Sequence, residues 1–386
     1  MDSDVATQIG IEEERDEGIS LGVEAERPDP TGAALEIDRP FDPDKIKVLR
    51  ESKTISLLST RIDHDEIDLA PDFQRLARIW DNGRKSRLIE SILLRIPLPV
   101  FYVASDLQDT WAVVDGLQRL TTIHDFLKGE FALSGLEYLV QFNGDVFLDL
   151  PRSMQRRIEE TELVINIIQP GTPEEVMFNI FSRINTGGLT LNGQEIRHAL
   201  NKGRARTFLK ELASSDAFLQ ATTGSVSDTR MAGRECALRF LAFRFTNWRE
   251  YSTNDLDGFL NAAMQRINGL PSVELERYRA DFVRAMETAT AVFGNDAFRK
   301  RYEVNAGRNP ISKALLEVWA VTFAELNDDE RAKIIERRED VVAEFIELMR
   351  EDRDFEVAVS YSTGSPGRVH KRFLAIERLL ARILSK

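Results

Sequence analysis

The sequence predicts an α+β protein in which a mixed α/β core is followed by an all-helical region. Between residues 84 and 215, stretches with helical periodicity alternate with short runs of β-branched and aromatic residues. After about residue 215 the strand patterns disappear and long amphipathic stretches remain. We therefore predict an acidic tail (1–40), an α/β domain (41–215) and a helical domain (216–386).

The first forty residues differ from the rest of the chain in charge. They carry twelve acidic residues and three arginines, so most of the net charge of −13 lies in them. They contain few large apolar side chains, and such a segment buries too little surface to offset the entropy lost on ordering. We predict a flexible, disordered tail, which either has no specific task or acts as an autoinhibitory arm that mimics DNA.

The composition also bears on the compartment. No window approaches eighteen consecutive apolar residues, and the N-terminus is acidic where a signal peptide would be basic and then apolar. A single cysteine, Cys236, rules out internal disulfides and cysteine-based zinc clusters. The four histidines lack the spacing of metal ligands. We expect a cytoplasmic protein with no membrane partner.

Local patterns predict the elements of the α/β core. The predicted helices cover 84–95, 117–128 and 173–184, and the predicted strands cover 100–105, 110–115 and 163–168. The two strands at 100–115 form a pair. Asn192 and Glu195 have the spacing of a capping box, which predicts that another helix begins there.

The pattern of apolar residues after residue 215 predicts helices throughout. Apolar residues recur every three or four positions near 230–248, 253–268, 272–293, 310–325, 328–350 and 367–385. No fixed-period repeat links these stretches, so an α-solenoid is not favoured.

The sharpest local feature is the run Val113–Thr122, in which a strand ends at Asp115-Gly116 and a helix begins at once. The backbone N–H groups at the start of a helix can donate hydrogen bonds to a phosphate group. Gly116 has no side chain and would allow a ligand to approach the backbone closely. Arg119 could bind phosphate oxygens, and Gln118 could orient a water. Asp115 could bind a metal or act as a base. A plain turn followed by a salt-bridging arginine remains the simpler interpretation.

Other blocks occur around this motif in a fixed order. They are Pro71–Arg75 with Trp80, Phe181–Gly188, Gln194–Arg197 and Asn309–Trp319, with an arginine-rich helix at the C-terminal end. Together with the Asp115–Arg119 motif, they resemble the N-terminal domain family of GmrSD-type restriction systems. The resemblance spans roughly residues 45–380.

The resemblance implies a ParB/sulfiredoxin-like fold whose Asp-Gly-Gln-Gln-Arg motif binds and hydrolyses a nucleoside triphosphate, either GTP or ATP, with Mg²⁺. By position, the catalytic residues would be Asp115, Gln118 and Arg119, with Asp115 also holding the metal. Leu117 stands where the family usually has a glutamine, so hydrolysis could be slow while binding survives. The expected nucleotide contacts are Gly116, Gln74, Arg75, Thr121, Arg183 and Asn185.

Basic residues gather without an intervening acid at Arg197, Lys202, Arg204, Arg206 and Lys210. Two more basic clusters lie at 299–301 and 368–372. Such a run is either a solvated helix face or a surface that contacts the DNA backbone. We take Arg197, Lys202, Arg204 and Arg206 as candidate DNA contacts.

Two further motifs match known signatures only in part. Gly188–Gln194 has the glycine spacing of a phosphate-binding P-loop but lacks its lysine. Asp44, Glu51 and Lys53 have the residue types of the PD-ExK nuclease motif. The metal-binding acids of that fold lie on paired strands, and this stretch shows no strand pattern, so we interpret the match as chance.

These observations lead to one expected function and two alternatives. The first is a nucleotide-binding, NTP-hydrolysing component of a bacterial defence system that acts on foreign DNA, with DNA, a partner nuclease and a second copy as partners. The second is a non-catalytic nucleotide- or DNA-binding module that recruits a nuclease. The third is a nuclease that acts through the ParB-like core, against which the missing metal cluster counts.

Overall fold

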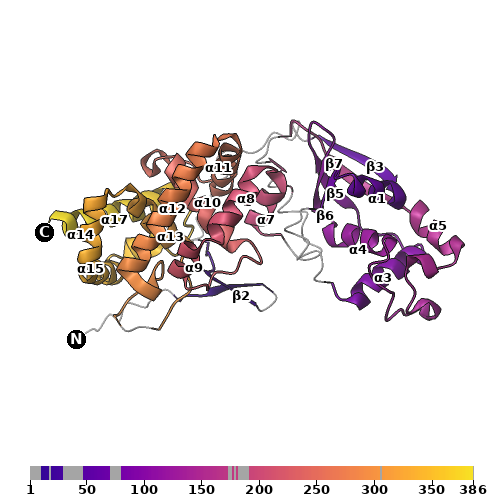
Figure 1. The fold of residues 1–386 in the computed structure, drawn as a ribbon, viewed down its shortest axis with the longest axis horizontal. Helices are drawn as coiled ribbons and strands as arrows, with labels where there is room; N and C mark the ends of the chain where they lie inside the picture. Colours follow the sequence, from indigo (N-terminus) through magenta and orange to yellow (C-terminus); the bar gives the residue numbers. More distant parts are fainter. Residues whose placement is uncertain are drawn as a thin grey trace. The chain divides into compact units, whose positions relative to one another are not determined.

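A computed structural model describes residues 10–16, 19–28, 47–69, 80–172, 176–177, 180, 191–304 and 307–385 of the chain. The chain divides into two compact units, one of residues 41–200 and the other of residues 1–40 together with 201–386. Figure 1 shows a sheet with helices in the first unit and mainly helices in the second. The predicted α+β class is confirmed.

The first unit contains a five-stranded sheet of order β3-β7-β5-β6-β4. The strands are β3 (Val48–Thr54), β4 (Ile67–Asp68), β5 (Phe101–Ser105), β6 (Trp111–Asp115) and β7 (Glu162–Ile168). β5 pairs antiparallel with β6 and parallel with β7, whereas β3 pairs antiparallel with β7. The predicted strand pair at 100–115 and the predicted strand at 163–168 are therefore confirmed.

Helices cover both faces of this sheet. They are α1 (Ile55–Asp63), α3 (Asn82–Leu93), α4 (Leu117–Leu127), α5 (Arg152–Glu160) and α7 (Gly193–Leu200), with the short turns η2 (Val140–Phe142) and η3 (Phe147–Asp149) in a loop. Side chains alternate along a strand. Phe101 and Val103 accordingly pack in one core with residues of α1, α3, α4 and α5. Ala104 packs on the other face with Ile196 of α7.

The helices predicted over 84–95 and 117–128 are confirmed by α3 and α4. The helix predicted over 173–184 lies mostly outside the described residues.

Strand β3 differs from the sequence prediction, which found no strand pattern around Glu51 and Lys53. Both residues lie on β3, where Glu51 pairs with Ile165 of β7. β3 is an edge strand of the sheet, and its side chains are exposed or half-buried. Its sequence therefore needs no alternation of apolar and polar residues. The Lys53 Nζ lies 2.8 Å from a carboxylate oxygen of Glu51. Asp44, the remaining acid of the nuclease-like motif, lies outside the described residues.

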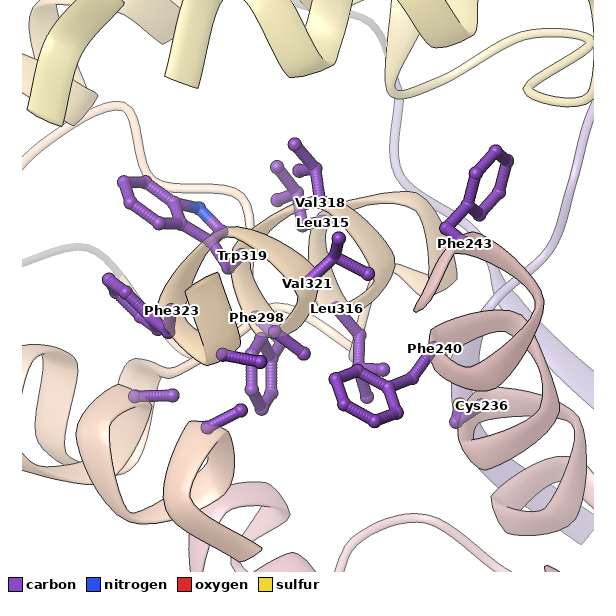
Figure 2. Packing of buried hydrophobic residues seen from close by; sticks show 14 of the residues in the cluster. Cys236, Phe240, Phe243, Phe298, Leu315, Leu316, Val318, Trp319, Val321 and Phe323 are labelled. Carbon is purple, nitrogen blue, oxygen red and sulfur yellow. The ribbon is translucent and has the colours of Figure 1, made fainter. Parts of the chain in front are cut away.

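The second unit is built around helix α13 (Lys313–Glu325). Every residue of α13 from Lys313 to Ala324 is buried, which is the pattern of a helix surrounded by others. Figure 2 shows its side chains pointing in several directions, with Leu316 toward Phe240 of α10. The remaining helices are α8 (Arg204–Ala213), α9 (Asp216–Thr222), α10 (Ala232–Phe245), α11 (Leu256–Gly269), α12 (Ser272–Phe293), α14 (Asp328–Glu336), α15 (Arg338–Glu351), α16 (Arg353–Ala358) and α17 (Pro366–Ser385).

The helical stretches predicted from periodicity agree with these helices, with one difference. The stretch at 328–350 forms two helices, α14 and α15, with Arg337 between them. Among the described residues, no helix is long and apolar enough to cross a membrane.

Residues 10–28 differ from the flexible tail that the sequence predicts. They contain the antiparallel strands β1 (Glu13–Asp16) and β2 (Ile19–Glu24), and Leu21 and Val23 are buried in the core of the helical unit. The backbone N–H of Glu24 donates to the Ile311 carbonyl over 2.7 Å. Two apolar residues and this backbone pairing are enough to order the segment, although its overall composition is acidic.

The acidic residues of this segment lie against buried cations of the helical unit. Carboxylate oxygens of Glu24, Glu14 and Glu26 lie 2.5 Å from Lys300, 3.1 Å from Lys313 and 2.7 Å from Arg239, respectively. The last two cations also pair with Glu235. The concentration of negative charge near the N-terminus is therefore explained in part by positive charge buried inside the unit.

The basic clusters at 299–301 and 368–372 are also largely internal. Arg299, Lys300 and Arg372 are all buried. Arg372 pairs with the buried carboxylate of Glu317, and Arg299 donates to the Ser225 hydroxyl over 2.9 Å. These three side chains do not form the phosphate-contacting surface that the sequence suggested, because their partners lie inside the unit.

Candidate nucleotide-binding site

The candidate site lies where β6 ends and α4 begins, at Gly116. This residue is the N-cap of α4 and has a φ of +96°, a conformation that glycine adopts readily. A Cβ atom at this position would lie 2.3 Å from Cδ1 of Phe101. No side chain caps the helix start, so its first N–H groups face outward without a side-chain acceptor from the N-cap. The junction has the form of an anion-binding helix start.

Arg119 joins this helix start to the beginning of β5. Its guanidinium donates to Oδ2 of Asp115 over 3.0 Å, to the Val100 carbonyl over 3.4 Å and to the Pro99 carbonyl. It also lies 4.3 Å from the ring centroid of Phe101, within cation–π distance. Arg119 is therefore held by the protein on several sides.

Arg119 is largely shielded from solvent. Its side chain is 12% exposed and that of Asp115 is 26% exposed. Burial lowers the pKa of Arg119, and the carboxylate of Asp115 opposes that shift. An arginine with this environment stays charged, because its ordinary pKa lies far above neutrality. The pair presents one positive and one negative group close to the helix start.

The other α4 residues of the motif point in different directions. Leu117 is half-buried and packs against the core of the unit. Gln118 is half-buried, and Thr121, three residues later, lies on the same side of the helix. Thr121 is 5% exposed, and its buried Oγ1 has no hydrogen-bond partner among the residues that the structure describes. Thr121 thus offers a hydroxyl that a ligand or water could satisfy.

Four of the predicted nucleotide contacts lie outside the described residues: Gln74, Arg75, Arg183 and Asn185. Trp80, which follows the first of these pairs, is half-buried against the core, with the guanidinium of Arg84 5.9 Å from its ring centroid. The structure therefore brings together Asp115, Gly116 and Arg119 and leaves the second half of the predicted pocket undescribed.

The predicted capping box at the start of α7 is confirmed. The backbone N–H of Glu195 donates to Oδ1 of Asn192 over 2.9 Å, and the N–H of Asn192 donates to Oε2 of Glu195 over 2.8 Å. Arg197, two residues further, is only 2% exposed and donates to Oε1 of Gln194 over 2.9 Å. A guanidinium so buried does not lie where a DNA contact needs it, so the structure differs here from the prediction.

The remaining candidate DNA contacts belong to the other unit. Arg204 is exposed and donates to the hydroxyl of Ser272 over 3.1 Å. Lys202 and Arg206 are half-buried, and Arg206 donates to the carbonyl of Asn201 over 3.2 Å. Arg204 is the most accessible of the four candidates.

A metal centre built only from protein ligands is not found in the described part of the chain. No group of three or more histidine, cysteine, aspartate or glutamate side chains there could hold a metal ion. Mg²⁺ often needs only one or two carboxylates, because phosphate oxygens and waters complete its shell. Asp115, at the edge of the helix start, is a fitting ligand of that kind.

The partners of Arg119 at the start of β5 and in the two residues before it were not predicted from the sequence. Phe101 and the carbonyls of Pro99 and Val100 hold the guanidinium as closely as Asp115 does. The only signal in the sequence is that a predicted strand pair joins residues 100–105 to the strand that ends at Asp115. Pairing in that register places Tyr102 opposite Asp115 and thus brings Phe101 to the junction.

Comparison with known families identifies the first unit. Residues 56–201 match the family described as the GmrSD restriction endonuclease, N-terminal domain. This segment is a GmrSD N-terminal domain. It nearly coincides with the compact unit 41–200 and contains the whole junction from Asp115 to Arg119. The resemblance expected over 45–380 is confirmed for this part of the chain.

The helical unit after residue 201 lies outside the matched GmrSD domain. No curated protein and no solved structure matches the chain.

Proposed function

We propose that the chain is a nucleotide-binding component of a DNA restriction system and that the β6–α4 junction of its GmrSD domain binds a nucleoside triphosphate. The family supports the link to restriction, and DNA is the substrate that this link suggests. The observation that carries the nucleotide site is the start of α4, where Gly116 supplies no side-chain cap and the guanidinium of Arg119 lies one turn further along the helix.

Each residue of the junction then has a defined part. The first N–H groups of α4 and the guanidinium of Arg119 bind phosphate oxygens, whose negative charge competes with Asp115 for that guanidinium. Asp115 would hold Mg²⁺, and the ion would supply positive charge to the phosphate oxygens. Thr121 contributes its buried hydroxyl, and Gln118 orients the attacking water. Gln74, Arg75, Arg183 and Asn185 complete the pocket, and GTP and ATP are both candidates.

A binding module without hydrolysis is the second candidate function, and Leu117 favours it. The family's glutamine is missing at this position, and the leucine packs against the core. It therefore offers no group to a water molecule. Such a module would recruit a partner nuclease when nucleotide is bound. A nuclease acting through the domain itself is the third candidate, and Arg204, Lys202 and Arg206 would serve any of the three as DNA contacts.

Nucleotide binding is tested by calorimetry on the full chain with a matched control. Arg61 resembles Arg119 closely: it is 12% exposed, pairs with Asp109 at 3.0 Å and lies 4.0 Å from the Trp111 ring centroid. We expect Arg119→Ala to weaken binding of GTP or ATP at least tenfold and Arg61→Ala to leave it unchanged. Equal weakening in both variants would indicate general destabilisation and contradict the site.

Turnover is tested by phosphate release in the presence of Mg²⁺ and double-stranded DNA. If Gln118 orients water, the unmodified chain releases phosphate and Gln118→Ala loses most of the rate while retaining nucleotide binding. If the missing glutamine is the essential one, Leu117→Gln gains activity. Nucleotide binding without release from either protein would leave the binding module as the function.

A further inference from the structure

A cavity lies in the unit of residues 41–200, here called the GmrSD unit, away from the β6–α4 junction. It has a volume of about 600 Å³ and lies between the end of α3, helix α5 and the start of β7. Its floor is formed by the buried side chains of Ile92, Phe101 and Leu163, and Pro97 lies at its rim. Half of the residues that line the cavity are charged or polar, and its volume lies within the range of small-molecule sites.

Three arginines line the same cavity, and they are weakly paired. The guanidinium of Arg95 has no hydrogen bond or ion pair with any residue that the structure describes. Arg156 approaches an acid only at 3.9 Å, in an exposed pair with Glu160. Arg157 donates from Nη1 to the Leu93 carbonyl over 2.8 Å, but its Nε is buried without a partner in the described chain. Arg95 and Arg156 are both exposed, so their guanidinium groups can pair with an anionic ligand in the cavity.

Arg95 also has an unusual backbone. It follows the end of α3 and has a φ of +58°, in the left-handed region. The N–H of Arg95 donates to the carbonyl of Ile92, and that of Ile96 to the carbonyl of Ser91, which is the hydrogen-bond pattern of a Schellman motif. Glycine or asparagine usually occupies the left-handed position of that motif. An arginine there adds strain, as do six other non-glycine residues with a positive φ in the described part of the chain.

We propose that this cavity binds a small organic anion, with its apolar or planar body on the floor and a phosphate, sulfonate or carboxylate group against Arg95 and Arg156. Glu160 and Glu162 also line the cavity, so the three arginines leave a single net positive charge, which matches a ligand with one anionic group. The cavity shares Phe101 with the nucleotide site, but it needs neither nucleotide nor hydrolysis.

The first test measures binding of 1-anilinonaphthalene-8-sulfonate, an aromatic monoanion, by fluorescence titration of the full chain. We expect saturable binding of one probe per chain. Arg95→Gly should weaken this binding at least fivefold and raise the melting temperature, because glycine adopts the left-handed conformation without strain. Arg152→Gln is the matched control, since Arg152 lies on α5 but does not line the cavity.

The second test distinguishes the contribution of the cavity space to probe binding from that of the arginine charges. Ser153 lines the cavity from an exposed position of α5, so Ser153→Trp should fill the space and block the probe while all three arginines remain. The proposal is overturned if Arg95→Gly binds the probe normally, if Arg152→Gln weakens binding equally, or if Ser153→Trp has no effect. A lower melting temperature for Arg95→Gly would also overturn it, because Arg95 would then be a structural residue.

Discussion

The Nζ of Lys300 lies 2.5 Å from Oε1 of Glu24, although 276 positions separate the two residues in the chain. Both are buried. Burial raises the pKa of Glu24 and lowers that of Lys300, while the charge of each partner opposes the shift of the other. The pair therefore keeps its charges only because the two residues lie together, which makes each one sensitive to loss of the other.

Glu24→Gln is expected to lower the free energy of unfolding by about 3 kcal/mol, because it leaves the buried ammonium of Lys300 without a carboxylate. Urea unfolding measures this. The control is Glu12→Gln, in which Glu12 is 76% exposed in its pair with Arg27 and should contribute less than about 1 kcal/mol. Equal losses in both variants would contradict a special role for the buried pair.

Gly116→Ala is expected to be much more destabilising than Gly144→Ala. Both glycines have nearly the same φ, +96° and +98°, but a Cβ at position 144 meets nothing within 4 Å. The Gly144 variant therefore measures the backbone strain alone, about 1–2 kcal/mol. The contact with Phe101 should add about 1–3 kcal/mol at position 116. Chemical unfolding of the two variants gives the difference, and equal losses would show that the ring moves aside freely.

Arg119→Ala is expected to lower stability as well as nucleotide binding. The sequence alone left two roles open for Arg119, a contact with phosphate oxygens or a plain salt bridge. In the structure its guanidinium donates to Asp115 and to the carbonyls of Pro99 and Val100. Losing these contacts should lower the free energy of unfolding by about 1–3 kcal/mol without nucleotide. A melting curve unchanged from that of the unmodified chain would show that water replaces the guanidinium at no cost.

Glu90 provides a pH-dependent test of the loop that follows α4. Burial would raise the pKa of Glu90, but backbone N–H donors from Leu139, Tyr138 and Glu137 outweigh it and leave the pKa below its ordinary value of 4.5. Its stabilising contribution is therefore present above pH 4.5 and is lost as the pH falls through the lowered pKa.

At pH 7, Glu90→Gln should cost about 1–3 kcal/mol, because an amide nitrogen then faces a backbone donor. The cost should shrink as the pH falls through the lowered pKa of Glu90, where the glutamate itself takes up a proton. Unfolding curves at pH 7 and at acidic pH measure the change. Glu137→Gln, which removes only an exposed partner 3.9 Å from Arg87, should behave like the unmodified chain at both.

Local chemistry made much of the GmrSD unit predictable. The Asn192–Glu195 capping box, the paired strands around residue 108 and the helix after Gly116 each follow from residues close together in the sequence. Strand β3 was missed because it lies at the end of the sheet order, where polar side chains face solvent and leave no apolar alternation.

Distant partners account for the other differences. A run of charged residues predicts a solvent-exposed surface when only its neighbours in the sequence are considered. Lys300 and Arg372 are instead buried, and they form ion pairs with Glu24 and Glu317, which lie far away in the sequence. Likewise, the acidic composition around Glu24 predicted disorder, because nothing near it in the sequence reveals the cations that it meets.

The pairing of residues 19–27 with residues near 311 and 361 has a consequence for how the protein is made. Val23 and Arg27 are synthesised long before their backbone partners, which are Ile311 and Tyr361, respectively. The GmrSD unit holds all five strands of its sheet within residues 48–168 and can close while the ribosome is still at work. In the helical unit, β2 lacks its backbone contacts with Ile311 until that residue has been synthesised. Until then, Leu21 and Val23 lack part of the core that buries them in the folded chain.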